Sequence, residues 1–324
     1  MNKRTRYFAV GSVAIVVVGL CTGLVAFYNG GLSLLSSAQG PSEMAYLPAD
    51  ATGVGYANVQ AIMNSEFRQK LNQAMPTGEE RGKFLQETGI DIERDIDTVV
   101  GAVSAGRGVG VVLVRGRFNE GQIESLVRQG GGDVEEYQGI RLVTAGRDGV
   151  SVNTDTPSVA FLKMGLLAIG QKAAIKQAID AEASGQNVTT NTELMKYVND
   201  IRGGQSAWAV GRFDEFQKQA EIPDQIKQHL PAVQWVALTT QINGGISGSI
   251  RAETTDDAAA ENLRDVVRGG LAMGRLVSGQ DQKIKLLLDS MQMSGTGKTV
   301  ALTFSVSPEM VDVLAGLASM SERQ

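Results

Sequence analysis

Cysteine, histidine and basic charge are scarce in this sequence. One cysteine among 324 residues excludes a disulfide framework and any zinc site built from several cysteines. The 30 lysines and arginines against 35 acidic residues leave a net charge of −5. This balance argues against nucleic-acid binding, because a basic face is needed to displace counterions from phosphates. Apolar residues make up 43% of the chain, close to the norm for a folded protein, so wholesale disorder is excluded.

A long uncharged run is present near the N-terminus. Residues 7–28 carry no charge, and as a helix they span about 33 Å, enough to cross a hydrocarbon core of about 30 Å. Three basic residues lie in the preceding segment 1–6, whereas residues 29–42, on the other side of the run, hold no charge. The positive-inside rule therefore predicts a cytoplasmic tail at 1–6, a transmembrane helix at 7–28 and export of everything that follows.

This segment has two other interpretations. A cleaved signal peptide would use the small residues at 36–38, but the apolar run exceeds the 7–15 residues typical of such peptides, which favours an uncleaved anchor. A lipoprotein cysteine at Cys21 would follow a small residue, whereas Leu20 precedes it and the apolar run continues past it. We therefore interpret Cys21 as an apolar filler within the span.

The rest of the chain divides into a linker and two lobes. Residues 29–48 are rich in glycine and serine and contain two prolines, which is typical of a linker. We predict a first lobe over 49–190 and a second over 191–324. Residues 1–28 hold three basic and no acidic groups, so the remainder has 27 basic against 35 acidic groups and a net charge of −8. A domain of that charge is not drawn to anionic lipid headgroups.

Beyond residue 48 the hydrophobic pattern alternates between the periods of strands and helices. The predicted strands are 54–59, 98–103, 109–114, 133–137, 140–145, 150–153, 159–164, 166–169, 207–213, 234–241, 246–252, 284–293 and 299–306. The predicted helices are 61–75, one capped by Asn119 and ended by the glycines 130–132, 171–184, 214–229, 255–276 and one that begins at Pro308. Tight hairpins imply antiparallel sheets with helices packed on one face, an α+β class.

The two lobes overlay loosely in sequence. Tyr56 with its following alanine falls on Trp208 with its following alanine, and the valine-rich hairpin at Val99 falls on that at Val236. Each half then reads strand, helix, hairpin, helix, hairpin. This order suggests an internal duplication.

A glycine-rich segment near the C-terminus resembles the end of a phosphate-binding loop. Residues 294–299 read SGTGKT, but the full loop requires a glycine at position 292, where this chain has Gln292. A phosphate loop must also lead into a helix, whereas residues 299–306 alternate as a strand does. We therefore predict a hairpin turn at 295–298 and no nucleotide.

Four acidic residues are spaced two apart between Asp91 and Asp97. A calcium loop of the EF-hand type needs glycine at its sixth position and glutamate at its twelfth, where Ile96 and Ala102 stand here. We interpret the segment as a solvated strand edge with its acids on one side. An opportunistic calcium site is the alternative.

No catalytic set can be assembled from the sequence. His229 is the single imidazole, and it lies near a predicted helix end, where it suits the helix dipole as a cap. The acid pairs 79–80, 135–136 and 256–257 are adjacent in sequence and therefore face apart, and no G-x-S-x-G motif occurs. We predict that the protein is not an enzyme and that it has no catalytic, cofactor-binding or metal-binding residues.

The remaining motifs have structural interpretations. Tyr56, Trp208 and Trp235 lie on predicted strands and are expected to pack in the core, with a groove for an apolar partner as the alternative. Residues 187–189 form an N-glycosylation sequon, which has meaning only in a host that glycosylates.

Two short phrases carry a resemblance to other proteins. Residues 47–59 (LPADATGVGYANV) and 166–180 (LLAIGQKAAIKQAID) resemble those of bacterial single-pass membrane-anchored extracytoplasmic proteins of unknown function. Their ectodomains open with a Leu-Pro-Ala-Asp phrase and later carry a strand that ends in glycine before an alanine-rich helix. The resemblance implies an anchor in the bacterial inner membrane with a periplasmic or other extracytoplasmic domain, and it implies no catalytic residues.

The anchor and the lack of a catalytic set favour a non-enzymatic envelope protein that binds or scaffolds another membrane or envelope protein. The alternative is a carrier or sensor of a small apolar ligand, which requires a closed pocket lined by methionines and aromatic residues. A hydrolase is a third hypothesis, and it requires two carboxylates that converge in a cleft.

Overall fold

The computed structural model describes residues 41–66, 68, 82, 85–86, 88–104, 108–146, 156–201, 203–215, 232–242, 245–277, 285 and 288–307. The predicted tail 1–6 and membrane span 7–28 lie outside these ranges, so they remain predictions. Among the helices within the ranges, none combines the length and the apolar character that a membrane crossing requires.

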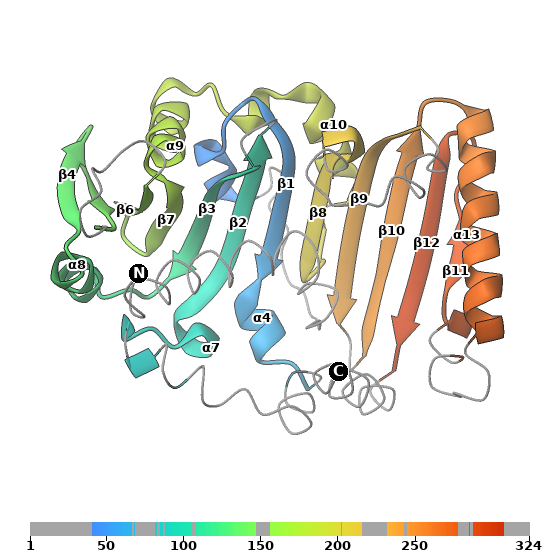
Figure 1. The fold of residues 1–324 in the computed structure, drawn as a ribbon, viewed down its shortest axis with the longest axis horizontal. Coiled ribbons are helices and arrows are strands. Elements are labelled where there is room, and N and C mark those ends of the chain that lie inside the picture. Colours follow the sequence, from blue (N-terminus) through green and yellow to red (C-terminus); the bar gives the residue numbers. More distant parts are fainter. Residues whose placement is uncertain are drawn as a thin grey trace.

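Twelve strands form one antiparallel sheet in the order β11-β12-β10-β9-β8-β1-β2-β3-β7-β6-β5-β4 (Figure 1). The strands are β1 (Ala51–Asn58), β2 (Ile96–Ser104), β3 (Gly108–Gly116), β4 (Asp133–Tyr137), β5 (Ile140–Thr144), β6 (Pro157–Lys163), β7 (Leu166–Gln171), β8 (Ala207–Arg212), β9 (Val233–Ile242), β10 (Ile246–Thr254), β11 (Gln292–Ser294) and β12 (Thr299–Val306). The hairpins predicted at 98–114 and 234–252 are confirmed as β2–β3 and β9–β10.

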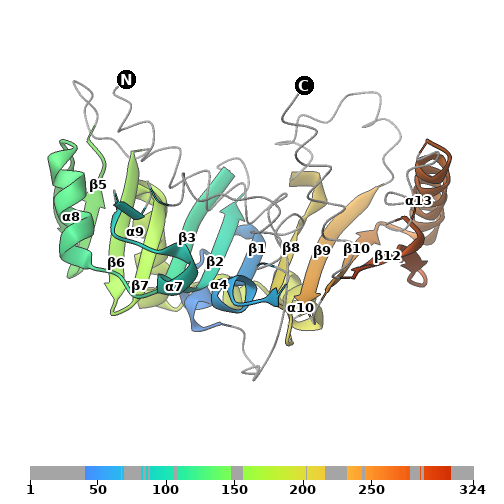
Figure 2. The same cartoon turned by 90° about the horizontal axis from the view of Figure 1, so that it is seen from below.

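Helices flank this sheet and stand at its two ends. They are α4 (Val59–Met63), α7 (Ile92–Asp95), α8 (Glu120–Gln129), α9 (Lys172–Ser184), α10 (Thr192–Ile201) and α13 (Asp257–Val277), with 3-10 helices η2 (Ser42–Tyr46) and η3 (Val188–Thr190). Figure 2 shows the sheet bent into a trough, with α8 and α13 at its opposite ends. The predicted α+β class is confirmed.

The main core lies between one face of the sheet and η2, η3, α9 and α10. Its fully buried side chains include Met44, Leu113, Ile175, Leu194 and Val198. A smaller cluster on the opposite face gathers residues that alternate with the first set along β2 and β3. Both faces of the first half are therefore apolar, which explains the unbroken valine runs in these strands.

Several predicted helix starts are confirmed by their capping hydrogen bonds. The side chain of Asn119 accepts from the backbone N–H of Gln122 at 3.1 Å, at the start of α8. The carboxylate of Asp256 accepts from the N–H of Ala259 at 2.8 Å, at the start of α13. Such a cap satisfies a backbone donor that has no partner within the helix.

The predictions for the linker 29–48 and for the strand 284–293 are wrong in part. The end of the predicted linker 29–48 belongs to the fold, because η2 buries Met44 and Tyr46 in the core. The predicted strand 284–293 is reduced to β11, since residues 285, 288 and 289 are helical. The reason is tertiary: Leu288 lies against Gly274, and Arg275 donates to Asp289 at 3.2 Å, so this segment packs along α13.

The prediction that the acidic segment from Asp91 to Asp97 forms a strand edge holds only for its last two residues. The segment opens as the short helix α7, because the carboxylate of Asp91 accepts from the N–H of Glu93 at 3.1 Å and that of Asp95 accepts from the N–H of Asp91 at 2.8 Å. Asp91 is only 4% exposed and pairs with Arg94 at 2.8 Å. These local caps outweigh the alternating pattern, and the strand begins at Ile96.

Further predicted elements lie outside the described residues. They are the strand 150–153, the helix that begins at Pro308, and most of the helices 61–75 and 214–229.

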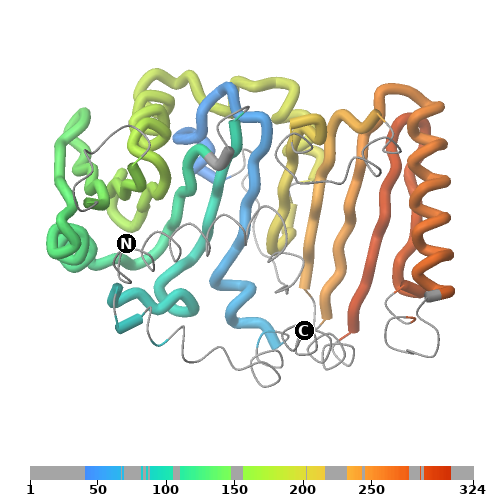
Figure 3. The backbone as a smooth tube through the Cα atoms, in the orientation of Figure 1, coloured from blue at the N-terminus to red at the C-terminus, as the bar shows by residue number. Residues whose placement is uncertain are grey.

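The two predicted lobes share the sheet, which crosses the boundary between them without interruption. Strand β1 pairs with β8, and Tyr56 stands opposite Trp208 in that pair. Figure 3 shows the two strands side by side although they are far apart in the sequence. Outward from this pair, the order is β1-β2-β3-β7-β6-β5-β4 on one side and β8-β9-β10-β12-β11 on the other.

One ion-pair cluster fixes the edge strand β4 to α9 and makes stability depend on pH. Glu135 accepts from Lys172 at 2.7 Å and contacts Lys176 at 2.9 Å. These hydrogen bonds, that from Lys172 above all, lower the pKa of the Glu135 carboxyl below 4.5. The stabilisation is therefore fully present above about pH 4.5, and is lost as the pH falls through the lowered pKa.

We expect Glu135→Gln to reduce the free energy of unfolding at pH 7 by at most about 1 kcal/mol, because the pair is partly exposed. The difference from the wild type should shrink in acid, once the wild-type carboxyl is protonated. Urea unfolding at neutral and acidic pH measures both values. Glu136→Gln is the matched control, because Glu136 is exposed. An equal loss for both variants at pH 7 would contradict this account.

Candidate interaction surface

The predicted hairpin turn at 295–298 is confirmed between β11 and β12. Gly295 and Gly297 have φ of 100° and 57°, a backbone conformation that favours glycine. The ammonium of Lys298 donates to the carbonyl of Thr255 at 2.9 Å. The residues that resemble a phosphate loop thus connect the turn to the start of α13.

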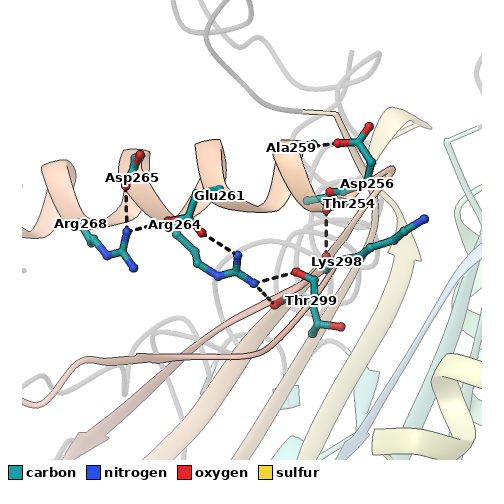
Figure 4. Close-up of polar contacts among 10 residues, drawn as sticks. Thr254, Asp256, Ala259, Glu261, Arg264, Asp265, Arg268, Lys298 and Thr299 are labelled. Carbon is teal, nitrogen blue, oxygen red and sulfur yellow. Dashed lines mark hydrogen bonds and ion pairs between the residues drawn. The ribbon is translucent and has the colours of Figure 1, made fainter.

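Arg264 locks α13 onto this turn, as Figure 4 shows. Its guanidinium is largely buried and donates to the carbonyls of Gly297 at 2.7 Å and Thr299 at 3.1 Å. The hydroxyl of Thr254 lies 2.9 Å from the Lys298 carbonyl, to which it donates. These contacts hold the N-terminal half of the helix in one orientation at the end of the sheet.

The aromatic residues predicted on strands pack in the core. Trp208 and Trp235 are each 4% exposed. Tyr56 stacks on Trp208 with ring centroids 5.8 Å apart, and Tyr197 of α10 stacks on Trp235 at 4.8 Å. The indole N–H of Trp235 donates to Glu193 at 3.1 Å. Burial, and to a lesser degree the nearby Glu43 carboxylate, raises the pKa of Tyr56.

The other candidate residues fall at separate places. Within the described ranges no three or more His, Cys, Asp or Glu residues converge as a metal site would require, and this includes the segment from Asp91. In the pair 256–257, Asp256 caps α13, and both residues are exposed. Residues 79–80 and His229 lie outside the described ranges.

The sequon at 187–189 is built into the fold. Asn187 is 7% exposed. Its side-chain oxygen accepts from the N–H of Thr189 at 3.1 Å and from the hydroxyl of the same residue at 2.6 Å, at the start of η3. In the folded chain this asparagine serves as a cap.

A polar hollow lies along the outer side of α8. It has a volume of about 490 Å³ and is lined by Gly121, Glu124, Ser125, Arg128 and Gln129. All five residues come from one helix and none is a methionine or an aromatic. The hollow therefore differs from the closed apolar pocket that the ligand-carrier hypothesis requires.

Exposed apolar side chains are concentrated on α13. The large apolar residues exposed in the described part of the chain are Met164, Ile250, Val266, Met273 and Leu276, and the last three belong to this helix. Met273 is 66% exposed and Leu276 is 81% exposed. Contiguous exposed apolar groups of this kind mark interaction sites on folded proteins.

The exposed residues of α13 lie along one side of the helix. At 3.6 residues per turn, Val266, Met273 and Leu276 share a stripe with two glycines; we define this outer stripe of α13 as Val266, Gly269, Gly270, Met273 and Leu276. Leu263, Val267 and Leu271 are half-buried on the adjacent side of the helix, which lies against β10 and β12, whereas Val266 is 49% exposed. The apolar surface of α13 is therefore wider than its contact with the sheet.

The two glycines of the outer stripe pack against none of the residues that the structure describes. A Cβ atom added to Gly269 or Gly270 would meet none of their atoms within 4 Å. Each glycine in a helix interior costs about 1 kcal/mol relative to alanine. No contact among the described residues offsets that cost at these two positions.

Charged residues form a band beside the outer stripe. Glu261 contacts Arg264 at 3.0 Å and Arg268 at 3.2 Å, and Asp265 contacts Arg268 at 2.8 Å (Figure 4). Hydrogen bonds from Arg264, and then from Arg268, lower the pKa of the Glu261 carboxyl. The stripe thus has a polar border, as protein contact sites have. Hydrophobic periodicity could find the helix, but it could not tell which of its apolar sides stays exposed.

We expect Gly269→Ala and Gly270→Ala each to raise the free energy of unfolding by about 0.5–1 kcal/mol, since alanine is the better helix former and the added methyl meets open space. Chemical denaturation measures the change. The matched control is Gly185→Ala, which should destabilise the chain because Gly185 has φ of 72°. A loss of stability in the two helix variants would show that these glycines have a packing role.

Comparison with known proteins finds solved structures with a similar fold, but it assigns the chain to no family. No protein-family model matches the chain, and no curated protein matches its sequence. The solved structure of crystal form III of TP0453 is similar, with a TM-score of 0.50 and 9% identity over 84% of this chain and 96% of that chain. Crystal form I of TP0453 has a TM-score of 0.45 and 10% identity over 85% of this chain and 96% of that chain. At this identity the likeness is one of fold alone.

Proposed function

We propose that this chain is a non-enzymatic protein of the bacterial cell envelope that binds or scaffolds another membrane or envelope protein. The observation that carries the proposal is the outer stripe of α13, where three large apolar side chains are exposed together on one helix. Burying such side chains against a partner yields about 25 cal/mol per Å² of apolar surface.

The rigid attachment of α13 supports a role in binding. Arg264 of the helix donates to the carbonyl of Gly297 in the turn, and Lys298 of the turn donates to the carbonyl of Thr255 just before the helix. A surface that is already ordered loses little conformational entropy when it meets a partner.

The location rests on the sequence. We propose that residues 7–28 anchor the chain in the inner membrane, that 1–6 are cytoplasmic, and that the folded part is periplasmic or otherwise extracytoplasmic. The uncharged run and its basic N-terminal flank support this orientation, and so does the resemblance of residues 47–59 to anchored extracytoplasmic proteins.

We also propose that the lobes 49–190 and 191–324 arose by internal duplication. The five strands from the β1–β8 pair outward follow the same order on both sides, which supports it, while β5 and β4 of the first half have no counterpart in the second. The residues overlaid in sequence, Tyr56 and Trp208, face each other in that pair, as equivalent residues do about a local two-fold axis.

The carrier of a small apolar ligand is a second candidate. Leu238, Ile250 and Leu302 are register neighbours across β9, β10 and β12, and Ile250 is 42% exposed. These three residues belong to the sheet and not to the outer stripe of α13, so substitutions at the two places separate the two candidates experimentally.

We expect Met273→Glu in the full chain to lower the recovery of its protein partner by about tenfold or more, because a charge replaces an apolar contact. The measurement is crosslinking in intact cells, followed by gentle solubilisation and capture through a tag. Met164→Glu is the control, because Met164 is 94% exposed and lies far from α13 on the chain. Recovery of the wild-type chain alone, as a monomer, would overturn the proposal.

Protease added to intact spheroplasts should digest the folded part of the chain, since the proposed topology exposes it. A cytoplasmic marker protein should survive the same treatment until the cells are lysed. Protection of the bulk of the chain until lysis would reverse the proposed orientation.

A further inference from the structure

The sheet formed by β9, β10 and β12 has one apolar and one polar face along its middle. Leu238, Ile250 and Leu302 are register neighbours and therefore share a face, and we call them the Ile250 row. The next residues along β9 and back along β10, Thr239 and Ser249, point to the other face, where their hydroxyl oxygens lie 2.8 Å apart. The two faces thus meet different surroundings.

The apolar face is covered at one end and open in the middle. The row at which β12 ends consists of Ile242, Ile246 and Val306, which are all buried. Four residues further along β10, Ile250 is exposed, and its neighbours in the Ile250 row are only half-buried. Apolar surface is therefore left over directly beside the covered row.

The chain leaves the sheet at the covered row. Val306 is the last residue of β12, and residues 308–324 follow after Ser307. Four residues of β12 separate Val306 from the Ile250 row, a distance of about 13 Å. A helix covers that distance in about nine residues, so a segment that turns back from Val306 reaches the Ile250 row well before the chain ends.

The sequence that follows Ser307 has the pattern of a helix with one apolar side. Pro308 is favoured in the first turn, and Asp312 and Ser319 project from the side opposite to the apolar one when the segment is drawn as a helix. The apolar side consists of Met310, Val313, Leu314, Leu317 and Met320. Such a side needs an apolar surface to pack against, because a short helix is marginal in water without tertiary contacts.

We propose that residues 308–320 form a helix that turns back over β12 and packs its apolar side on the apolar face of β9, β10 and β12, with Leu314 and Leu317 over the Ile250 row. A helix of this length spans about 20 Å, whereas the eight residues of β12 span about 26 Å. The segment therefore fits along the strand that it follows.

The attachment of this segment to β12 favours it over a separate molecule. A covalently linked segment binds at a high effective concentration, which neither a partner protein nor a free ligand has. Packing on the sheet also leaves Asp312 and Ser319 in water. The inference is independent of the partner proposed for α13. It places the chain's own segment where the second candidate function places a small apolar ligand.

Cysteine crosslinking in the full chain tests the contact. In a chain that carries Cys21→Ser, the pair Ile250→Cys with Leu317→Cys should form a disulfide within one chain under mild oxidation, because a disulfide joins Cα atoms up to about 7 Å apart. The yield should be several-fold higher than for Ile250→Cys with Ser319→Cys. Thr303→Cys with Leu317→Cys is the control for the sheet, since Thr303 is exposed on the polar face. Mass spectrometry of the digested monomer identifies the bond.

A charge exchange provides a second measurement that does not require oxidation. Ile250→Glu and Leu317→Lys should each lower the midpoint of thermal unfolding by a few degrees, because each places a charge in an apolar contact. The double variant should recover part of the loss, since the two charges then face each other. Ser319→Lys is the matched control and should leave the midpoint unchanged.

Disulfide yields no higher than in the two control pairs, together with additive effects of Ile250→Glu and Leu317→Lys, would overturn the proposed packing. Disulfides that join two chains instead of closing one would assign the face to the segment of a second copy and would equally overturn packing within the chain. Recovery of a partner through Met273 is a separate readout, so the proposed function stands or fails without this contact.

Discussion

The structure depends on the pairing of β1 with β8, which joins two halves into one sheet. Small residues make this pair close: a Cβ on Gly53 would come within 3.1 Å of the Val210 carbonyl and 3.3 Å of the Gly211 Cα. Tyr56 and Trp208 stack across the pair and bury their rings against the main core. Without the β1–β8 pair, each half would expose the unpaired backbone edge of its innermost strand. Such an edge can pair with a strand of another chain and cause aggregation.

The edge strands at the two ends of the sheet make different contacts. At one end the short strand β4 is clamped to α9 by Glu135 and its lysine partners. At the other end, β11 pairs with only three residues of β12. Helix α13 lies beside it with one apolar side exposed to solvent. The end that the chain leaves incomplete is thus the end that carries the candidate surface, which links the architecture to the proposed role in binding.

Much of the fold is predictable from local signals. The hairpins around β2–β3 and β9–β10, the cap at Asn119 and the turn before Thr299 all depend on residues close together in the chain. The failures arise where another interaction competes with periodicity. Reciprocal caps convert the alternating acids after Asp91 into a helix, and packing along α13 replaces the strand predicted at 284–293.

The sequence by itself determined the α+β class, the caps and most of the strands, because backbone propensity, turn residues and hydrophobic period act over a few residues. Only the tertiary structure decided that β1 meets β8, that Asn187 is buried, and that the sheet covers one apolar side of α13 while Met273 stays outside. Those outcomes depend on contacts between segments far apart in the chain, and a local pattern does not specify which of several apolar surfaces finds a neighbour.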